Sequence, residues 1–230
     1  RFGACVVAGP LRVNDPIVQR IHEAGCPYMA MGRLDSFPDV SCATVDYEEA
    51  AYISTKFLID KGHTRIGMLK GLEGYQPGVE RDRGYQRALE EAGIPFDEAL
   101  VRPTTFDSDN NVRITHRLLH DRDITGLVEC SGTEDGSSIR EGARRAGRMP
   151  GENLDIVEWT YTYKASVVSE AAAHVWLPLR EAGSEGLELL ADWFYERRTD
   201  PFQVLYRPIL YETPHNGDVE PPRPVFSVNP

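Results

Sequence analysis

Short apolar runs alternate with amphipathic stretches of helical period through most of this 230-residue chain. Apolar runs at 4–8, 28–31 and 65–69 are each followed by a helical stretch that ends at a glycine. Strands joined by helices of this length run parallel, because each helix returns the chain to the same end of the sheet. The alternation therefore predicts an α/β fold built on largely parallel sheets.

Individual elements are predicted from capping residues and from the spacing of apolar side chains. Asp15-Pro16 supplies an N-cap and a first-turn proline for a helix at 16–24. Asp46 caps a second helix, which ends at Lys61-Gly62. The other expected helices cover 79–92, 111–120, 133–146 and an apolar stripe at 179–194, the other expected strands cover 100–102, 126–129, 155–159 and 204–211, and a proline-rich tail begins at Pro214.

The charge balance of the chain limits its partners. Asp and Glu number 36 against 25 Lys and Arg, which gives a formal net charge of −11. A chain this acidic repels phosphate backbones on average, so these residues are not expected to bind nucleic acid themselves. No stretch approaches the roughly 20 apolar residues that cross a bilayer. This argues against an integral membrane protein.

Metal-binding and catalytic patterns are weak. His116 and His120 are four residues apart on an expected helix and could chelate a metal, but a solvated helix face is the favoured interpretation. Gly71-Leu72-Glu73-Gly74 lacks the Lys-Ser/Thr of a phosphate loop, and no G-x-S-x-G surrounds Ser131. We therefore expect neither an enzyme nor a cofactor. The cysteines form no C-x-x-C pair and are expected to be reduced thiols: Cys5, Cys26, Cys42 and Cys130.

The most informative stretch lies between residues 43 and 101. It contains TVDYEEAA at 44–51, KGHTRI at 61–66, ERDRGYQRAL at 80–89 and EAGI at 91–94. This order and spacing resembles the effector-binding core of the LacI/GalR family of bacterial transcriptional regulators, whose motifs include V-D-x-x-x-G/A-A, G-H-x-R-I and R-x-x-G-Y/F. Weaker similarity covers the whole chain.

The resemblance implies an α/β fold of two doubly wound, parallel-sheet subdomains of periplasmic-binding-protein type I, with a ligand in the cleft between them. Three crossovers between the subdomains then fall near Val45, Trp176 and Asp200. The family's DNA-binding headpiece is expected to lie outside this chain. The expected division is 1–45 plus 177–200 for the first subdomain (incomplete at its N-terminus), 46–176 plus 201–213 for the second, and 214–230 for a tail.

The resemblance also implies which residues face the ligand. Arg81, in the R-x-x-G-Y motif, matches an arginine whose planar fork donates paired hydrogen bonds to ligand hydroxyls or a carboxylate. The alternative is a solvated arginine on a charged helical turn. Phe106 matches an aromatic wall, with core packing as its alternative. The expected ligand-binding residues are Gly32, Val45, Arg81, Phe106, Ser131, Thr160 and Tyr161.

Some of these positions depart from the family's pattern. Ser131-Gly132 stands where the family has Asn-Asp, and Thr160 stands where it has Asp. Because acidic acceptors are lost while Arg81 and Arg33 remain, a generic pyranose ligand is in doubt. A sugar-derived acid or a phosphosugar would be tolerated better than in the family at large. The expected ligand is thus a sugar or an acid derived from one.

Two classes of function stay open. The first is the effector-binding and dimerisation core of a cytoplasmic transcriptional regulator, which reaches operator DNA through its headpiece. Its homodimer would involve surfaces at 133–146 and 163–169. The second is a solute receptor of a sugar transport system with the same fold. Unpaired cysteines and the KGHTRI turn favour the regulator. An enzyme on a doubly wound sheet would need a cofactor fingerprint, which the sequence lacks.

Overall fold

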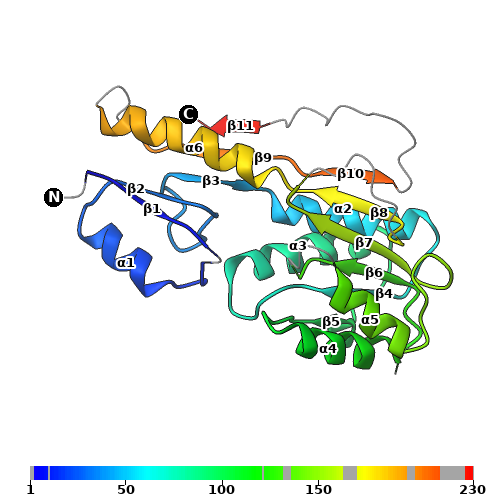
Figure 1. Cartoon of the computed structure of the whole chain (residues 1–230). Coiled ribbons are helices and arrows are strands. Elements are labelled where there is room, and N and C mark those ends of the chain that lie inside the picture. The colour runs from blue at the N-terminus through cyan, green and yellow to red at the C-terminus, as the bar shows by residue number, and fades with distance from the viewer. Residues whose placement is uncertain are drawn as a thin grey trace.

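Two β-sheets, each with its own helices, make up the computed structural model of this chain (Figure 1). We call the part built on the first sheet lobe 1 and the part built on the second sheet lobe 2. Lobe 1 lies at the upper left of Figure 1, and lobe 2 at the lower right. The structure describes residues 3–9, 11–120, 122–131, 136–162, 170–195 and 200–212, together with the backbone of 226–229.

Lobe 1 is a five-stranded sheet with helices α1 (Pro16–Glu23) and α6 (Leu179–Phe194). α6 approaches the sheet closely at Gly186, where a Cβ would lie 2.4 Å from the Cβ of Ala43. Neighbouring strands are parallel, except at one edge, where β11 (Phe226–Asn229) pairs antiparallel with β9 (Gln203–Tyr206). In sheet order the strands are β1 (Cys5–Val7), β2 (Tyr28–Ala30), β3 (Cys42–Val45), β9 (Gln203–Tyr206) and β11 (Phe226–Asn229).

Lobe 2 is a six-stranded sheet, parallel except for its antiparallel edge strand β10. In sheet order its strands are β10 (Ile209–Glu212), β8 (Ala173–Trp176), β7 (Asp155–Thr160), β6 (Gly126–Glu129), β4 (Ile66–Leu69) and β5 (Val101–Arg102), the last preceded by the short 3-10 helix η1 (Glu98–Leu100). Four helices cover this sheet: α2 (Tyr47–Asp60), α3 (Gln76–Glu91), α4 (Ser108–His120) and α5 (Ser137–Arg145).

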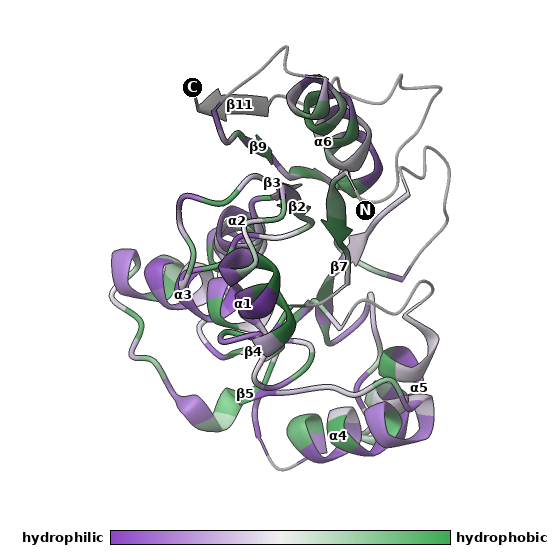
Figure 2. Cartoon of the chain, turned by 90° about the vertical axis from the view of Figure 1, so that its left-hand side faces the viewer, coloured by the Kyte–Doolittle hydropathy of each residue, from purple (hydrophilic) through white to green (hydrophobic). Residues whose placement is uncertain are grey.

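Successive side chains along the strands of lobe 2 point to opposite faces of the sheet and pack against helices on both faces. Met68 and Val128 belong to a core cluster shared with α2 and α3, whereas the next residue along the first of these strands, Leu69, packs with α4 and α5. Figure 2 shows the pair α4 and α5 apart from α2 and α3. Strand β3 is coloured largely hydrophobic there, while the helices carry both kinds of residue. A sheet covered in this way leaves only its loops and strand ends for function.

Most of the expected elements are present, with ends that shift by a few residues. α3 begins at Gln76 rather than at 79, because Tyr75 takes the extended N-cap conformation and Pro77 fits the first turn. Residues 133–135 of the expected helix at 133–146 lie outside the described residues. Periodicity did not predict β3 and β8. Each has four buried residues in a row, so neither alternates, and the polar Thr44 and His174 keep them from forming a continuous apolar run.

The C-terminal part corrects three expectations. The single strand expected at 204–211 is two strands, β9 in lobe 1 and β10 in lobe 2, separated by Arg207-Pro208. Proline has no N–H to donate to a ladder, which favours a break at this point. Residues 203–206 therefore belong with the first sheet, and the crossover lies at 207–208 rather than near Asp200. The expected tail is also wrong in part, because 226–229 form β11, paired with β9.

Up to β10 the chain thus passes between the lobes three times, and it returns to lobe 1 once more between β10 and β11. It crosses at Asp46, between β3 and α2, and at Leu177-Pro178, between β8 and α6, close to the crossovers expected near Val45 and Trp176. The third crossing is the one at Arg207-Pro208. These three connections hold the two sheets side by side and leave a cleft between the loops that follow their strands.

Candidate ligand-binding cleft

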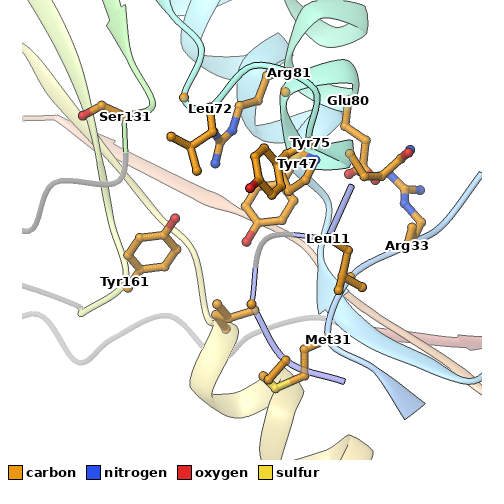
Figure 3. A pocket seen from close by; sticks show the side chains of 18 of the residues that line it. Leu11, Met31, Arg33, Tyr47, Leu72, Tyr75, Glu80, Arg81, Ser131 and Tyr161 are labelled. Atoms are coloured by element: carbon orange, nitrogen blue, oxygen red, sulfur yellow. The ribbon is translucent and has the colours of Figure 1, made fainter. Parts of the chain in front are cut away.

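Loops from both lobes enclose a cleft of about 320 Å³. Lobe 1 contributes residues that follow β1 and β2, and lobe 2 contributes residues that follow β4, β5, β6 and β7. The volume falls in the range of small-molecule sites, roughly 300–1,000 Å³. Figure 3 labels ten of the side chains that line it: Leu11, Met31, Arg33, Tyr47, Leu72, Tyr75, Glu80, Arg81, Ser131 and Tyr161.

Arg81 lies in the second turn of α3, and the residue is only 7% exposed. Its guanidinium carbon lies 5.2 Å from the ring centre of Tyr47 and 5.0 Å from that of Trp159. Nη1 donates a hydrogen bond to the carbonyl oxygen of Lys70 at 2.8 Å, whereas the buried Nε has no hydrogen-bond partner. The alternative of a solvated Arg81 is therefore wrong. The side chain is a buried cation with donors left over for a ligand.

The turn before α3 leaves room for this guanidinium. Gly71 has a φ of +86°, and a Cβ at this position would lie 2.2 Å from Nη1 of Arg81. A side chain at Gly71 would thus both strain the backbone and displace the arginine. The segment 71–74, expected to be an ordinary turn, contributes Gly71 and Leu72 to the lining of the cleft.

Aromatic rings form much of the cleft wall. Tyr47, the first residue of α2, stacks on Trp159 with 6.1 Å between the ring centres and 15° between the ring planes. Burial, assisted by nearby Tyr161, raises the pKa of Tyr47 well above its usual value, so its hydroxyl stays protonated at neutral pH. Tyr75 and Tyr161 line the same space (Figure 3). The cleft therefore offers flat apolar surfaces beside neutral hydroxyl groups.

The second arginine of the cleft is held by two carboxylates. Nη2 of Arg33 lies 3.3 Å from a carboxylate oxygen of Glu80 and 3.4 Å from one of Asp46. Burial raises the pKa of Glu80, and Arg33 opposes that effect. Asp46 also caps α2 as predicted, because it accepts the N–H of Glu49. The positive charge of Arg33 is thus compensated within the protein, which removes one of the two cations that favoured an acidic ligand.

A buried polar cluster lies behind Ser131. Glu129 accepts the N–H of Ser131 at 2.8 Å and also contacts its hydroxyl. In the sheet ladder Glu129 stands opposite Glu158, and Glu158 pairs with Arg140 and lies 3.7 Å from Nε2 of His174. Burial raises the pKa of Glu129 to about 7, and the charge of Glu158 adds to this effect. These carboxyl groups make the surroundings of Ser131 unfavourable for an anion.

Five of the seven expected ligand-binding residues line the cleft, and their roles in binding stay predictions. Phe106 is 84% exposed, which excludes the core alternative and places it at the rim. Val45 is fully buried in β3 and does not reach the cleft. Thr160 instead closes the turn after β7, since its hydroxyl donates to the carbonyl of Thr162 at 2.7 Å. The five are Gly32, Arg81, Phe106, Ser131 and Tyr161.

Sequence reasoning missed Tyr75 and Gln76, which begin α3 and also line the cleft. The Gln76 residue is 1% exposed, and neither its amide nitrogen nor its oxygen makes a hydrogen bond. The amide still contributes, after Arg83, to lowering the pKa of Asp35, so it faces that carboxylate without hydrogen-bond geometry. A buried amide in this state gains free energy from any ligand hydroxyl that reaches it. The only sequence feature that pointed to Gln76 was its position after β4, where the strand ends at the cleft side of the sheet.

The lobes touch each other at one side of the cleft. The N–H of Gln76 donates to the carbonyl oxygen of Leu11 at 2.8 Å. Nearby, a guanidinium nitrogen of Arg83 lies 2.6 Å from a carboxylate oxygen of Asp35. Together with Arg33 and Glu80, these contacts join the loops of lobe 1 to the start of α3 in lobe 2. The cleft is therefore closed on this side by bonds between the lobes.

Other motif residues support the fold instead of the cleft. His63 binds the hydroxyl of Thr125 at 2.8 Å and a carboxylate oxygen of Asp155 at 3.1 Å, which ties the turn after α2 to β6 and β7. Tyr85 donates from its hydroxyl to the carbonyl of Ile66 at 2.7 Å. The motifs that carry the family resemblance thus combine three cleft residues, Tyr47, Glu80 and Arg81, with several residues that join helices to strands.

In the part of the chain that the structure describes, no three His, Cys, Asp or Glu side chains are grouped to hold a metal ion. The rings of His116 and His120 stack on α4 with 5.3 Å between their centres. Within the same residues, no helix has the length and apolar character needed to cross a bilayer.

Comparison with known proteins gives consistent matches. Residues 55–212 match the family described as periplasmic binding protein-like domain. The HTH-type transcriptional regulator CelR of Thermobifida fusca is 31% identical over 199 residues, covering 85% of this chain and 58% of CelR. Catabolite control protein A of Priestia megaterium is 23% identical over 189 residues, covering 82% and 57%. The chain thus spans little more than half the length of these relatives.

Solved structures agree with the sequence matches. A complex of the transcriptional regulator CelR with cellobiose superimposes with a TM-score of 0.80 at 29% identity, covering 92% of this chain and 65% of that one. A regulatory protein of the LacI family from Chloroflexus aggregans gives a TM-score of 0.79 at 24% identity, covering 94% and 77%, and supports the fold alone.

Proposed function

Because this chain belongs to the family of periplasmic binding protein-like domains, in the form of the LacI/GalR effector-binding core, we propose that its cleft binds a small-molecule effector of a transcriptional regulator. The observation that carries the proposal is the buried Arg81, with unused donors, facing a cleft walled by aromatic rings. The regulator would act as a homodimer in the cytoplasm and would contact operator DNA through a headpiece outside these residues.

The ligand we propose is a neutral sugar of mono- or disaccharide size. Arg33 is paired with Glu80 and Asp46, and the carboxyl of Glu129 lies behind Ser131, so the cleft has little net positive charge. The relative CelR was solved with cellobiose, which is an uncharged disaccharide. The sugar acid favoured by the sequence alone becomes the alternative ligand.

Each group has a defined part in this binding. Arg81 would donate hydrogen bonds to sugar hydroxyls, since among the described residues its guanidinium has one acceptor, the carbonyl oxygen of Lys70. The amide of Gln76 can accept from one hydroxyl and donate to another. The rings of Tyr47, Tyr75 and Tyr161 pack against the apolar faces of the sugar.

The regulator is favoured over the transport receptor. The curated relatives CelR and catabolite control protein A both carry names of regulators. These relatives also give no support to an enzyme on this fold. The proposal therefore keeps a binding role without catalysis.

Isothermal titration calorimetry tests the ligand class directly. Cellobiose is titrated into the chain, in parallel with cellobionic acid, which adds one carboxylate, and with glucose 6-phosphate. We expect the neutral sugar to bind and the two anions to bind more weakly. Tight binding of an anion without binding of the neutral sugar would contradict the charge argument, and no binding of any sugar or sugar derivative would contradict the proposed effector class.

Arg81→Ala tests whether this arginine anchors the ligand in the cleft, by comparison of its sugar affinity with that of the parent chain. Removing a charged hydrogen-bonding anchor costs about 2–4 kcal/mol, a loss of affinity of roughly 30- to 1,000-fold. Arg113→Ala, on the exposed face of α4, is the control and should bind like the parent chain. Arg87 is less suitable, because it pairs with Glu48 and Glu49. A folded Arg81→Ala chain with parental affinity would place the ligand elsewhere.

A further inference from the structure

Two of the four cysteines meet at the edge of lobe 1. Cys5 lies in β1, and Cys26 lies in the loop that leads from α1 to β2. Their sulfur atoms are 3.7 Å apart, and both residues are half-buried. Cys42 and Cys130 are buried. Since all four cysteines belong to the described residues, the contact singles out one pair of thiols that small molecules in solution can reach.

The backbone of the sheet holds this pair together. The N–H of Cys5 donates to the carbonyl oxygen of Pro27 at 2.9 Å, and Cys5 stands opposite Tyr28 in the parallel ladder. Cys26 is two residues before Tyr28, so its side chain projects to the same face as that of Cys5. A disulfide bond is about 2.05 Å long, so the sulfur atoms need to approach by about 1.7 Å.

We propose that Cys5 and Cys26 form a redox-sensitive dithiol site that low-molecular-weight disulfides oxidise to an intramolecular disulfide. The thiolate of one cysteine attacks a sulfur of R–S–S–R and displaces one R–S⁻. The thiolate of the other attacks the resulting mixed disulfide, forms the Cys5–Cys26 bond and displaces the second R–S⁻. The protein loses two hydrogen atoms, and the small disulfide is reduced to two R–SH.

The surroundings of Cys26 determine the rate of this exchange. The hydrogen bond with Cys5, followed by burial, raises the pKa of Cys26 above its usual value. Little thiolate is then present at neutral pH, so exchange should be slow and should accelerate as the pH rises. The same strand β1 leads directly to Ala8 and Gly9, which line the cleft. A bridge would therefore fasten a cleft-forming segment to its neighbour.

Oxidised glutathione is a suitable probe. The folded chain is incubated with an excess at pH 8, quenched with acid, and examined by intact mass and by peptide mapping without reduction. We expect a mass lower by two hydrogen atoms, a peptide pair linked through Cys5 and Cys26, and two thiols that react with an alkylating agent only after denaturation. Because the bridge closes a loop of about 20 residues, the oxidised chain should melt several degrees above the reduced chain.

Two variants keep the test decisive. Cys26→Ser, in an exposed loop, should retain one glutathionyl group on Cys5 and show no rise in melting temperature. Cys42→Ser should still form the bridge. The proposal is overturned if the parent chain keeps four free thiols, if it stops at a glutathione adduct, or if the linked peptides include Cys42 or Cys130.

Discussion

Glu129 shows how a single buried carboxyl group links the cleft to the stability of the chain. The residue is 1% exposed, and burial raises its pKa to about 7, against an ordinary value of 4.5. Between these two pH values the folded chain holds a proton that the unfolded chain releases. The free energy of unfolding contributed by this group therefore falls as the pH rises from about 4.5 to 7, and stays at the lower level above that range.

Glu129→Gln should remove this pH dependence. The amide oxygen can still accept the N–H of Ser131, and no charge has to be buried at high pH. Relative to the parent, we expect the variant to gain about 2–3 kcal/mol in free energy of unfolding between pH 5 and pH 8. Urea denaturation at both pH values measures the difference in free energy of unfolding between variant and parent, with the exposed Glu152→Gln as control. An equal difference at both pH values would show that Glu129 does not titrate in this range.

Single residues also mark the limit of prediction from the sequence. Arg81 could be found because its motif is distinctive, and its burial agrees with a cleft role. Val45 and Thr160 are at strand ends, where a shift of one residue decides whether a side chain faces the cleft or the core. Gln76 could not be found, because its burial depends on a loop of lobe 1 around Leu11 that folds against it from far away in the sequence.

At the scale of elements, the contact between α2 and α3 depends on one glycine of the R-x-x-G-Y motif. A Cβ at Gly84 would lie 1.9 Å from the carbonyl oxygen of Glu48 and 2.9 Å from the backbone nitrogen of Tyr52. Backbone atoms cannot move aside as a flexible side chain can, so any larger residue separates the two helices. The motif glycine is thus a packing residue, one turn away from the cleft residue Arg81.

Gly84→Ala should destabilise the chain by about 3 kcal/mol, the upper part of the usual range for overpacking. Gly183→Ala in α6 is the control, because a Cβ there meets only the end of the flexible Met31 side chain, at 3.1 Å. That control should be neutral, or more stable by up to about 1 kcal/mol from helix propensity. Chemical denaturation compares the two. Similar stabilities for both variants would mean that α2 and α3 can separate at little cost.

Amphipathic helices and strands made of apolar runs were predictable, and buried strands that contain polar residues were not. The helices follow from apolar spacing and caps such as Asp46, which also marks the start of α2 in the structure. β3 and β8 are buried throughout, but Thr44 and His174 interrupt them, so neither strand stands out as an apolar run or alternates. The division between β9 and β10 depends on which sheet each half pairs with, and Pro208 alone does not reveal that.

At the scale of the whole molecule, we predict a homodimer. The LacI/GalR relatives suggest paired subunits, since two-fold symmetry suits the reading of palindromic DNA. The expected surfaces are α5 and residues 163–169, of which the latter lie outside the described residues. Light scattering at micromolar concentration should give twice the chain mass of 25.8 kDa. Particles of single-chain mass would contradict the prediction.

The contacts that close one side of the cleft have a consequence for an uncharged ligand. Arg33 with Glu80, and the more exposed Arg83 with Asp35, attract the two lobes to each other across the boundary that a ligand must bridge. Dissolved ions screen such attractions, most of all at the exposed pair. A sugar that carries no charge should therefore bind a few-fold more weakly as ionic strength rises, because the salt weakens the ion pairs that join the two lobes beside the cleft.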